Sequence, residues 1–191
     1  MTDRSQVAVE NISLAKLKPE DLIAPHFKVW ELTKSEVAAR RGVDNSFPSD
    51  AEAQAAVFLA RNVLEVMRAE FGAFSPNSVF RSQATERVLK QKPAGWISTS
   101  QHTQGCACDV EIAGVTTLEL AHWASRNLET FDQIICECYD PRQGPNSGWV
   151  HISLKAPGRG VNRRQLLSYV RDADSERWVY VSGLRESGVP C

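Results

Sequence analysis

Apolar residues recur every three or four positions along several segments of the chain, which is the spacing of one helix face. Three of these segments begin with the pattern of a capping box, a Ser or Thr followed three residues later by Glu. The pairs are Thr33 with Glu36, Ser49 with Glu52, and Thr116 with Glu119. Together with a fourth segment that is stopped by Pro93, they predict helices over residues 33–42, 49–71, 83–90 and 116–127.

Shorter segments that are rich in alternating or β-branched apolar residues predict strands. These segments cover residues 77–81, 107–112, 133–139, 149–154 and 178–181. In the second of them the alternation places Asp109 on one face, with Cys108 and Val110 on the other. Most helices precede most strands, which favours an α+β fold with helices packed on an antiparallel sheet over a doubly wound parallel sheet.

The length of 191 residues fits one globular domain with a sizeable core. Residues 1–26 are polar and are interrupted by Pro19 and Pro25, so we expect an N-terminal arm followed by one domain over residues 27–191. The start lacks the apolar stretch of a secretory signal, and no apolar run reaches the ~18 residues of a membrane span. We therefore expect synthesis in the cytoplasm and no membrane span.

The charges nearly balance, with 22 Lys and Arg against 23 Asp and Glu. The chain therefore lacks the excess of positive charge that a general nucleic-acid binder or a polybasic membrane protein carries. Two pairs among its five Cys, Cys106 with Cys108 and Cys136 with Cys138, have one residue between them. This spacing suits neither an easy disulfide on a strand nor a four-cysteine zinc site. We expect reduced thiols that pack as small apolar residues.

Residues 100–112, SQHTQGCACDVEI, carry the most informative chemistry. His102 would lie in a loop before a strand and Asp109 on that strand, with Gly105 allowing the loop to fold back. His151 lies on a later predicted strand, in GWVHIS. Imidazole and carboxylate groups are good zinc ligands, and a catalytic zinc needs three protein ligands and an open position. The three residues are thus candidates for a metal site.

The stretch SQHTQGCACDVEI resembles the Ser-x-His-x-x-Gly-x-Ala-x-Asp motif of the zinc D-alanyl-D-alanine carboxypeptidase family (metallopeptidase family fifteen, subfamily A). That family includes phage endolysins and shares its fold with the hedgehog signalling domain. Residues 27–45, the VFRSQ stretch at 79–83, and FDQIICE followed by WVHIS are similar to other motifs of the family, in the same order. The resemblance implies a hedgehog-like α+β fold and a zinc peptidase that acts on peptidoglycan peptides. It leaves open whether this is a D-Ala-D-Ala carboxypeptidase or an L-Ala-D-Glu-type endopeptidase.

The resemblance also implies roles for individual residues. Zn²⁺ would be bound by His102, Asp109 and His151. Glu137 is our candidate for the general base that takes a proton from water and passes it to the leaving amine. Arg81 would hold the substrate's carboxylate with its planar guanidinium fork. Ser100 would orient the substrate or the loop, although it is equally suited to a turn.

Three positions depart from the family pattern. Many members carry the catalytic Glu three residues before the last His, where this chain has Gly148, so the base must come from Glu137 instead. The usual Gly before the aromatic-Arg-Ser motif is Val79, and an Asn that often follows the Arg by five residues is Glu86. We expect Glu86 to pair with Lys90, four residues along a helix.

Two other functions are compatible with the same residues. The scaffold could retain zinc without turnover, as a structural or binding protein such as a virion component. A metal-free triad of Ser100, His102 and Asp109 is disfavoured because the Ser and His are too close along the chain. We read His122 as a helix-packing residue and His26 as solvated. The expected partner is a peptidoglycan peptide, and an enzyme without a secretory signal would need a phage-type route to the wall; the oligomeric state stays open.

Overall fold

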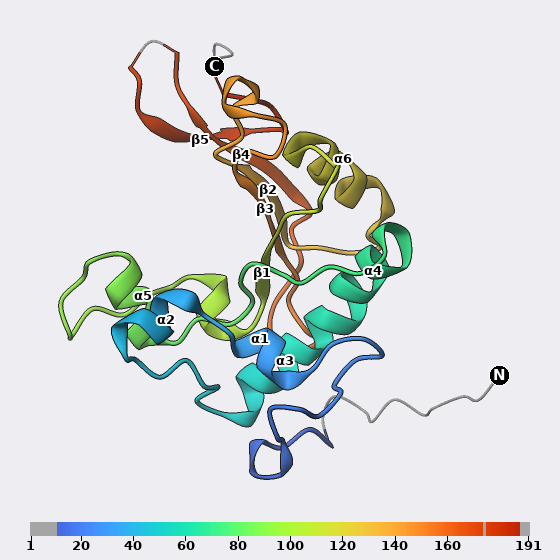
Figure 1. Ribbon diagram of the computed structural model, residues 1–191, viewed down its shortest axis with the longest axis vertical. Helices are drawn as coiled ribbons and strands as arrows, with labels where there is room; N and C mark the ends of the chain where they lie inside the picture. The colour runs from blue at the N-terminus through green and yellow to red at the C-terminus, as the bar shows by residue number, and fades with distance from the viewer. Residues whose placement is uncertain (1–10, 174, 188–191) are drawn as a thin grey trace. The chain divides into compact units, whose positions relative to one another are not determined.

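The computed structural model describes residues 11–173 and 175–187 (Figure 1). This part of the chain divides into two compact units. The first contains the described residues up to Glu65 together with Ser78–Ala107, and the second contains Val66–Asn77 and the residues from Cys108 onward. The expectation of an N-terminal arm over 1–26 and one domain over 27–191 stays a prediction, and its first ten residues lie outside the described part.

The first unit is helical. Its elements are η2 (Leu14–Lys16), α1 (Val29–Thr33), α2 (Glu36–Arg41), α3 (Asp50–Leu59), η3 (Ala60–Leu64), α5 (Gln83–Leu89) and η4 (Gln101–Gln104). The predicted start of α3 is correct, because Ser49 is its N-cap residue and its side chain accepts a hydrogen bond from the Ala51 N–H. The Ser49 hydroxyl donates to the Glu52 carboxylate, in place of the reciprocal backbone bonds of a full capping box. The capping-box prediction is wrong for α2: Thr33 ends α1, and Ser35 caps α2 by accepting from the Ala38 N–H.

The second unit, as far as it is described, contains a five-stranded sheet, two α-helices and one short 3-10 helix. Its elements are α4 (Glu65–Phe71), β1 (Ala107–Val110), α6 (Thr117–Asn127), β2 (Gln133–Glu137), η5 (Pro141–Gln143), β3 (Trp149–Ser153), β4 (Gln165–Arg171) and β5 (Trp178–Ser182). The strand order is β1-β3-β2-β4-β5. The mixed α+β class is as predicted, and α6 begins with the predicted capping box of Thr116 and Glu119.

Two features of the sheet differ from the prediction. Strand β4 was not predicted, and it pairs in parallel with β2, so the sheet is mixed rather than antiparallel. Strand β2 pairs antiparallel with β3, and β4 pairs antiparallel with β5. Residues 77–81 form no strand, because their N–H groups donate to separate segments: Asn77 to the Asp109 carbonyl, Phe80 to Leu32 and Arg81 to His102.

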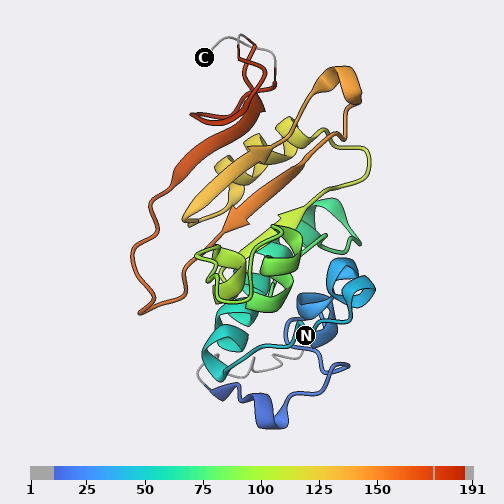
Figure 2. The same ribbon diagram turned by 90° about the vertical axis from the view of Figure 1, so that its left-hand side faces the viewer.

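The sheet has two unlike faces. On one face Ile134, Cys136, Val150 and Ile152 are fully buried, and α6 packs against β2 and β3. Figure 2 shows α6 behind the sheet. We call the opposite side the open face, because Tyr180 and Trp178 of β5 are exposed there; it also carries Glu137 and the buried His151. Burial on one face fixes the register, and therefore which side chains the open face presents.

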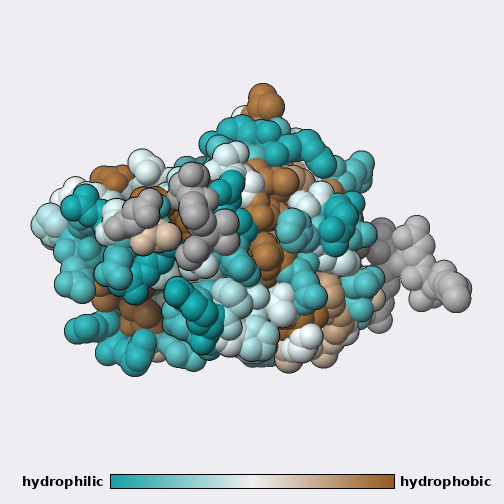
Figure 3. Space-filling view, turned by 90° about the horizontal axis from the view of Figure 1, so that it is seen from above, coloured by the Kyte–Doolittle hydropathy of each residue, from teal (hydrophilic) through white to brown (hydrophobic). Residues whose placement is uncertain are grey.

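The face seen in Figure 3 is mainly hydrophilic with several apolar groups among the polar side chains, as is normal for a folded protein. Within residues 11–173 and 175–187, no helix has both the length and the apolar character needed to cross a membrane.

Candidate metal centre

The loop that carries His102 is held by backbone contacts in the first unit. Gly105 follows η4 with φ +68°, and a Cβ at this position would lie 2.3 Å from the Glu52 carbonyl oxygen of α3. Only glycine allows this left-handed turn and this close approach. The His102 ring is 2% exposed, and its Nδ1 lies 2.7 Å from the Val79 carbonyl oxygen. Since a carbonyl can only accept, Nδ1 carries the hydrogen and Nε2 the lone pair.

Asp109 and His151 belong to the sheet of the second unit, on β1 and β3. Both are buried, with exposed fractions of 6% and 8%. Asp109 Oδ1 lies 3.2 Å from His151 Nδ1. Two ligands of a tetrahedral zinc, each about 2.0–2.1 Å from the metal, would be separated by roughly 3.3 Å. The observed separation therefore suits either a hydrogen bond or two atoms that share one cation.

His102, Asp109 and His151 each offer one ligand atom, and these three atoms lie within 4.8 Å of one another. The set consists of two imidazoles and one carboxylate, all buried, and this donor set fits Zn²⁺. Three protein ligands leave one position of a tetrahedral ion for water or substrate. The structure thus brings together the three residues grouped from the sequence, while their role as metal ligands stays a prediction.

Glu137 is placed by the register of the sheet. It is the last residue of β2, and its Cα partners are Trp149 on β3 and Tyr169 on β4. His151 pairs with Ile135, two residues before Glu137, so Glu137 and His151 are diagonal neighbours on the open face. The carboxylate and the imidazole therefore belong to one surface of the sheet.

Gly148 stands at the position where the resemblance leads us to expect a catalytic Glu. It has φ +72°, and a Cβ would lie 2.0 Å from the Glu137 carbonyl oxygen and 2.6 Å from the Cys138 carbonyl carbon. No real Cβ tolerates such contacts with backbone atoms, so this backbone cannot carry a Glu at 148.

Arg81 is part of a buried ionic network in the first unit. Its Nε donates to Ser78 Oγ at 2.9 Å, and its Nη1 lies 3.4 Å from the Glu86 carboxylate. Glu86 is fully buried and also contacts Lys90 and Ser98 Oγ. Burial opposes its charge, but the hydrogen bonds from Lys90 and Ser98 and the positive charges of Lys90 and Arg81 outweigh it and lower the pKa of Glu86. The predicted Glu86–Lys90 pair is present.

Ser100, and Asp132 with Gln133 in the FDQIICE stretch, have structural contacts. The Ser100 carbonyl accepts hydrogen bonds from the Thr103 N–H and hydroxyl, which closes the turn that begins η4. Asp132 is fully buried and forms an ion pair with Arg163, and Gln133 donates to the Gln165 side chain. Ser98, whose buried hydroxyl donates a hydrogen bond to Glu86, was not identified from the sequence. Its position two residues before Ser100 is the one sequence feature that could have pointed to it.

The described cysteines are free thiols. Burial is the main reason why the pKa of Cys136 is raised to about 12 and that of Cys138 to about 11. The negative charge of Glu137 adds to both shifts. Thiols that stay protonated at neutral pH are poor metal ligands. Outside the cluster, His122 is half-buried on α6, and His26 is exposed but contacts Glu65 at 2.8 Å.

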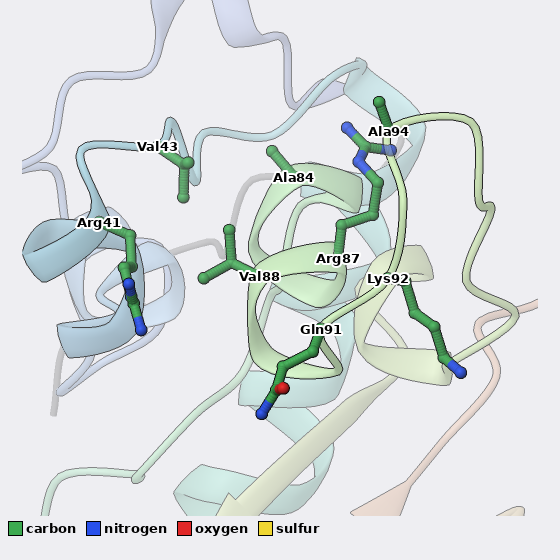
Figure 4. Close-up of a pocket in the computed structure, with 8 residues that line it drawn as sticks. All are labelled: Arg41, Val43, Ala84, Arg87, Val88, Gln91, Lys92 and Ala94. Carbon is green, nitrogen blue, oxygen red and sulfur yellow. The ribbon is translucent and has the colours of Figure 1, made fainter.

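A cavity of about 740 Å³ lies in the first unit, beside α5 (Figure 4). Basic side chains from Arg41, Arg87 and Lys92 border it, with Val43 and Val88 between them. None of the residues predicted for the active site lines this cavity.

A comparison with known protein families points to the same class of protein as the His/Asp/His cluster does. A sequence model described as Peptidase M15 matches residues 25–153, which is more than half of the chain and includes all three ligand candidates. The chain belongs to the peptidase M15 family. No curated protein and no solved structure matches it. Family membership and the His/Asp/His cluster together support a metallopeptidase in general.

Proposed function

We propose that this protein is a zinc-dependent peptidase that hydrolyses peptide bonds of peptidoglycan. The observation that carries the proposal is the buried group of His102, Asp109 and His151, whose ligand atoms lie within 4.8 Å of one another. When Zn²⁺ is bound, it supplies Lewis-acid activation of water and of the scissile carbonyl. The substrate is a stem or cross-bridge peptide, cut at a D-Ala-D-Ala or an L-Ala-D-Glu-type bond, as in an endolysin.

Glu137 acts as the general base in this proposal. Its carboxylate shares the open face with His151, takes the proton of the attacking water and delivers it to the leaving amine. Gly148 supports this assignment, because the backbone around it excludes a carboxylate at the alternative position. The proton that Glu137 takes from water is the one that it gives to the leaving nitrogen. Glu137 therefore returns to its carboxylate form, and the amine leaves as a neutral group.

Arg81 holds the substrate carboxylate in this proposal, and Ser100 positions the loop of His102. The Arg81 side chain is only 18% exposed, and Glu86 and Ser78 fix its orientation. A guanidinium held in one orientation loses little further entropy when it binds a carboxylate bidentately. The hedgehog-like fold and a phage-type route to the cell wall are further expectations of the same proposal.

The test compares metal content and turnover in matched variants. Purified protein is analysed for bound metal by mass spectrometry, and product release from muropeptides is followed by liquid chromatography. We expect Glu137→Gln to keep its metal and to lose turnover by about 10²–10⁴-fold. His102→Ala should lose both. Glu111→Gln, an exposed carboxylate just after β1, is the control and should retain both.

The outcomes separate the alternatives. Turnover by Glu137→Gln equal to that of the wild type would remove Glu137 from its role. Turnover that survives a strong chelator would contradict a metal-dependent reaction. A wild-type protein that holds zinc but releases no product from any muropeptide would instead favour the structural or binding protein considered above.

A further inference from the structure

A row of side chains crosses the open face at the level of Glu137. Trp149 of β3 pairs with Glu137 of β2, Glu137 pairs with Tyr169 of β4, and Tyr169 pairs with Tyr180 of β5. Cα partners in neighbouring strands project to the same face of a sheet. The proposed base therefore lies between one aromatic ring on the β3 side and two on the β4–β5 side, all within the second unit.

The two tyrosines of this row are in contact with each other and with solvent. Their ring centroids lie 4.5 Å apart, with an angle of 32° between the ring planes. Trp178, on the same strand as Tyr180, stacks on Tyr169 with centroids 5.5 Å apart. Tyr180 is nevertheless 60% exposed and Trp178 39% exposed. Exposed aromatic rings held by their neighbours are typical of recognition surfaces, because they offer contact area at a small entropic cost.

The Tyr180 hydroxyl lies in the electric field of the candidate site. Partial burial raises the pKa of Tyr180 to about 12, and the negative charges of Glu137 and Asp109 contribute. The phenol therefore keeps its proton at neutral pH and is a hydrogen-bond donor. The effect of the Glu137 charge on the pKa of Tyr180 agrees with the strand register. The register separates β5 from β2 by two strand spacings, about 10 Å.

We propose that Tyr169 and Tyr180 form a subsite for the extended peptide substrate, in which the Tyr180 hydroxyl donates to a backbone carbonyl of the peptide. The inference rests on the proposed function. An extended peptide advances about 3.3 Å per residue, so the subsite contacts the chain roughly three residues from the bond that is cut. The occupant is a peptide because the row is continuous with Glu137 and His151. The substrate class is thereby narrowed to peptides longer than a dipeptide.

The experiment measures binding without cleavage. In the Glu137→Gln background, calorimetry compares the stem pentapeptide L-Ala-D-Glu-L-Lys-D-Ala-D-Ala with the dipeptides D-Ala-D-Ala and L-Ala-D-Glu. We expect the pentapeptide to bind at least about tenfold more tightly than either dipeptide. Tyr180→Phe removes one hydrogen bond and should reduce that preference about five- to tenfold. Val161→Ser, an exposed residue outside the strands, is the control and should keep it.

A pentapeptide affinity that is equal with Tyr180 and with Phe at this position overturns the role of the hydroxyl. Equal affinity for pentapeptide and dipeptides overturns the subsite. Tyr169→Ala with Tyr180→Ala, checked for folding by circular dichroism, should abolish the remaining preference. Failure of the proposed function would be seen separately, as a wild-type protein that binds the pentapeptide but does not cleave it.

Discussion

The two parts of the candidate site are built by different means. His102 comes from the short helix η4 and Arg81 from irregular backbone, where single hydrogen bonds and an ionic network around Glu86 fix each side chain. Asp109, His151 and Glu137 come from strands, where pairing fixes all of them together. Placement by loops depends on a few contacts, whereas placement by strands is shared over a whole sheet. Substitutions should therefore act locally in the first part and cooperatively in the second.

The largest effects are expected at the two glycines that allow close backbone approach. Gly105→Ala and Gly148→Ala each force a Cβ against a carbonyl oxygen, at 2.3 and 2.0 Å. We expect each to lower the free energy of unfolding by about 4 kcal/mol, near the top of the range for single substitutions. Gly105→Ala should reduce the metal content through His102, and Gly148→Ala should reduce turnover through Glu137. Chemical denaturation, metal analysis and muropeptide hydrolysis measure these losses.

Gly114→Ala and Gly72→Ala are the matched controls, because both residues have positive φ but open space where the Cβ would lie. Each should cost only about 1 kcal/mol, the price of the left-handed conformation alone. If these controls cost as much as Gly105→Ala and Gly148→Ala, close approach would not be the reason for the glycines.

An intermediate effect is expected in the ionic network of Arg81. Glu86→Gln removes a buried charge between Lys90 and Arg81 and should lower the free energy of unfolding by about 2–3 kcal/mol at pH 7. It should also raise KM more than it lowers kcat, because Arg81 loses a contact that orients it. Exposed Glu129→Gln, the control, should change the free energy by less than about 0.5 kcal/mol.

The contribution of Glu86 to the free energy of unfolding should depend on pH. The folded-state pKa of Glu86 is below its usual 4.5, so this carboxylate contributes stability above about pH 4.5. That contribution is lost as the pH falls through the folded-state pKa. The difference in unfolding free energy between wild type and Glu86→Gln should therefore shrink on acidification. A difference that stays constant down to pH 2 would show that Glu86 carries no stabilising charge.

The smallest effect distinguishes two candidate helix caps. Ser35 caps α2, accepting a hydrogen bond from the Ala38 N–H at 3.2 Å. Ser35→Ala should lower the melting temperature, with a cost of about 1 kcal/mol. Thr33→Ala should have little effect, because Thr33 ends the preceding helix. The opposite order of melting temperatures would restore the cap expected from the sequence.

The sequence predicted the regular elements that depend on neighbouring residues. Alternation located the strand that carries Asp109, and runs of apolar residues located those that carry Glu137 and His151. The Ser/Thr-x-x-Glu patterns located α3 and α6. The sequence did not predict β4, because the adjacent Leu166 and Leu167 break the alternation, and its partner β2 lies about 30 residues away. A strand was wrongly predicted at 77–81, where local apolar residues concealed long-range hydrogen bonds.

The sequence predicted which residues belong to the candidate site, but it did not predict the contacts that hold their side chains. The motif supplied His102, yet its bond to the Val79 carbonyl joins residues 23 positions apart. Glu86 was expected to pair with Lys90 at helical spacing, but its contacts with Arg81 and Ser98 depend on how α5 meets the loop at 98–100. Such contacts are set by tertiary packing, which no local pattern encodes.

The position of β2 in the strand order has a consequence for substitutions. Glu137 lies on a strand with neighbours on both sides, whereas Tyr180 lies on the terminal strand of the order β1-β3-β2-β4-β5. A substitution in β5 therefore disturbs pairing with one neighbouring strand, whereas a substitution in β2 disturbs pairing with two. Under the proposed roles, changes in β5 would alter the peptide preference while β2, the strand of the proposed base, kept both of its neighbours.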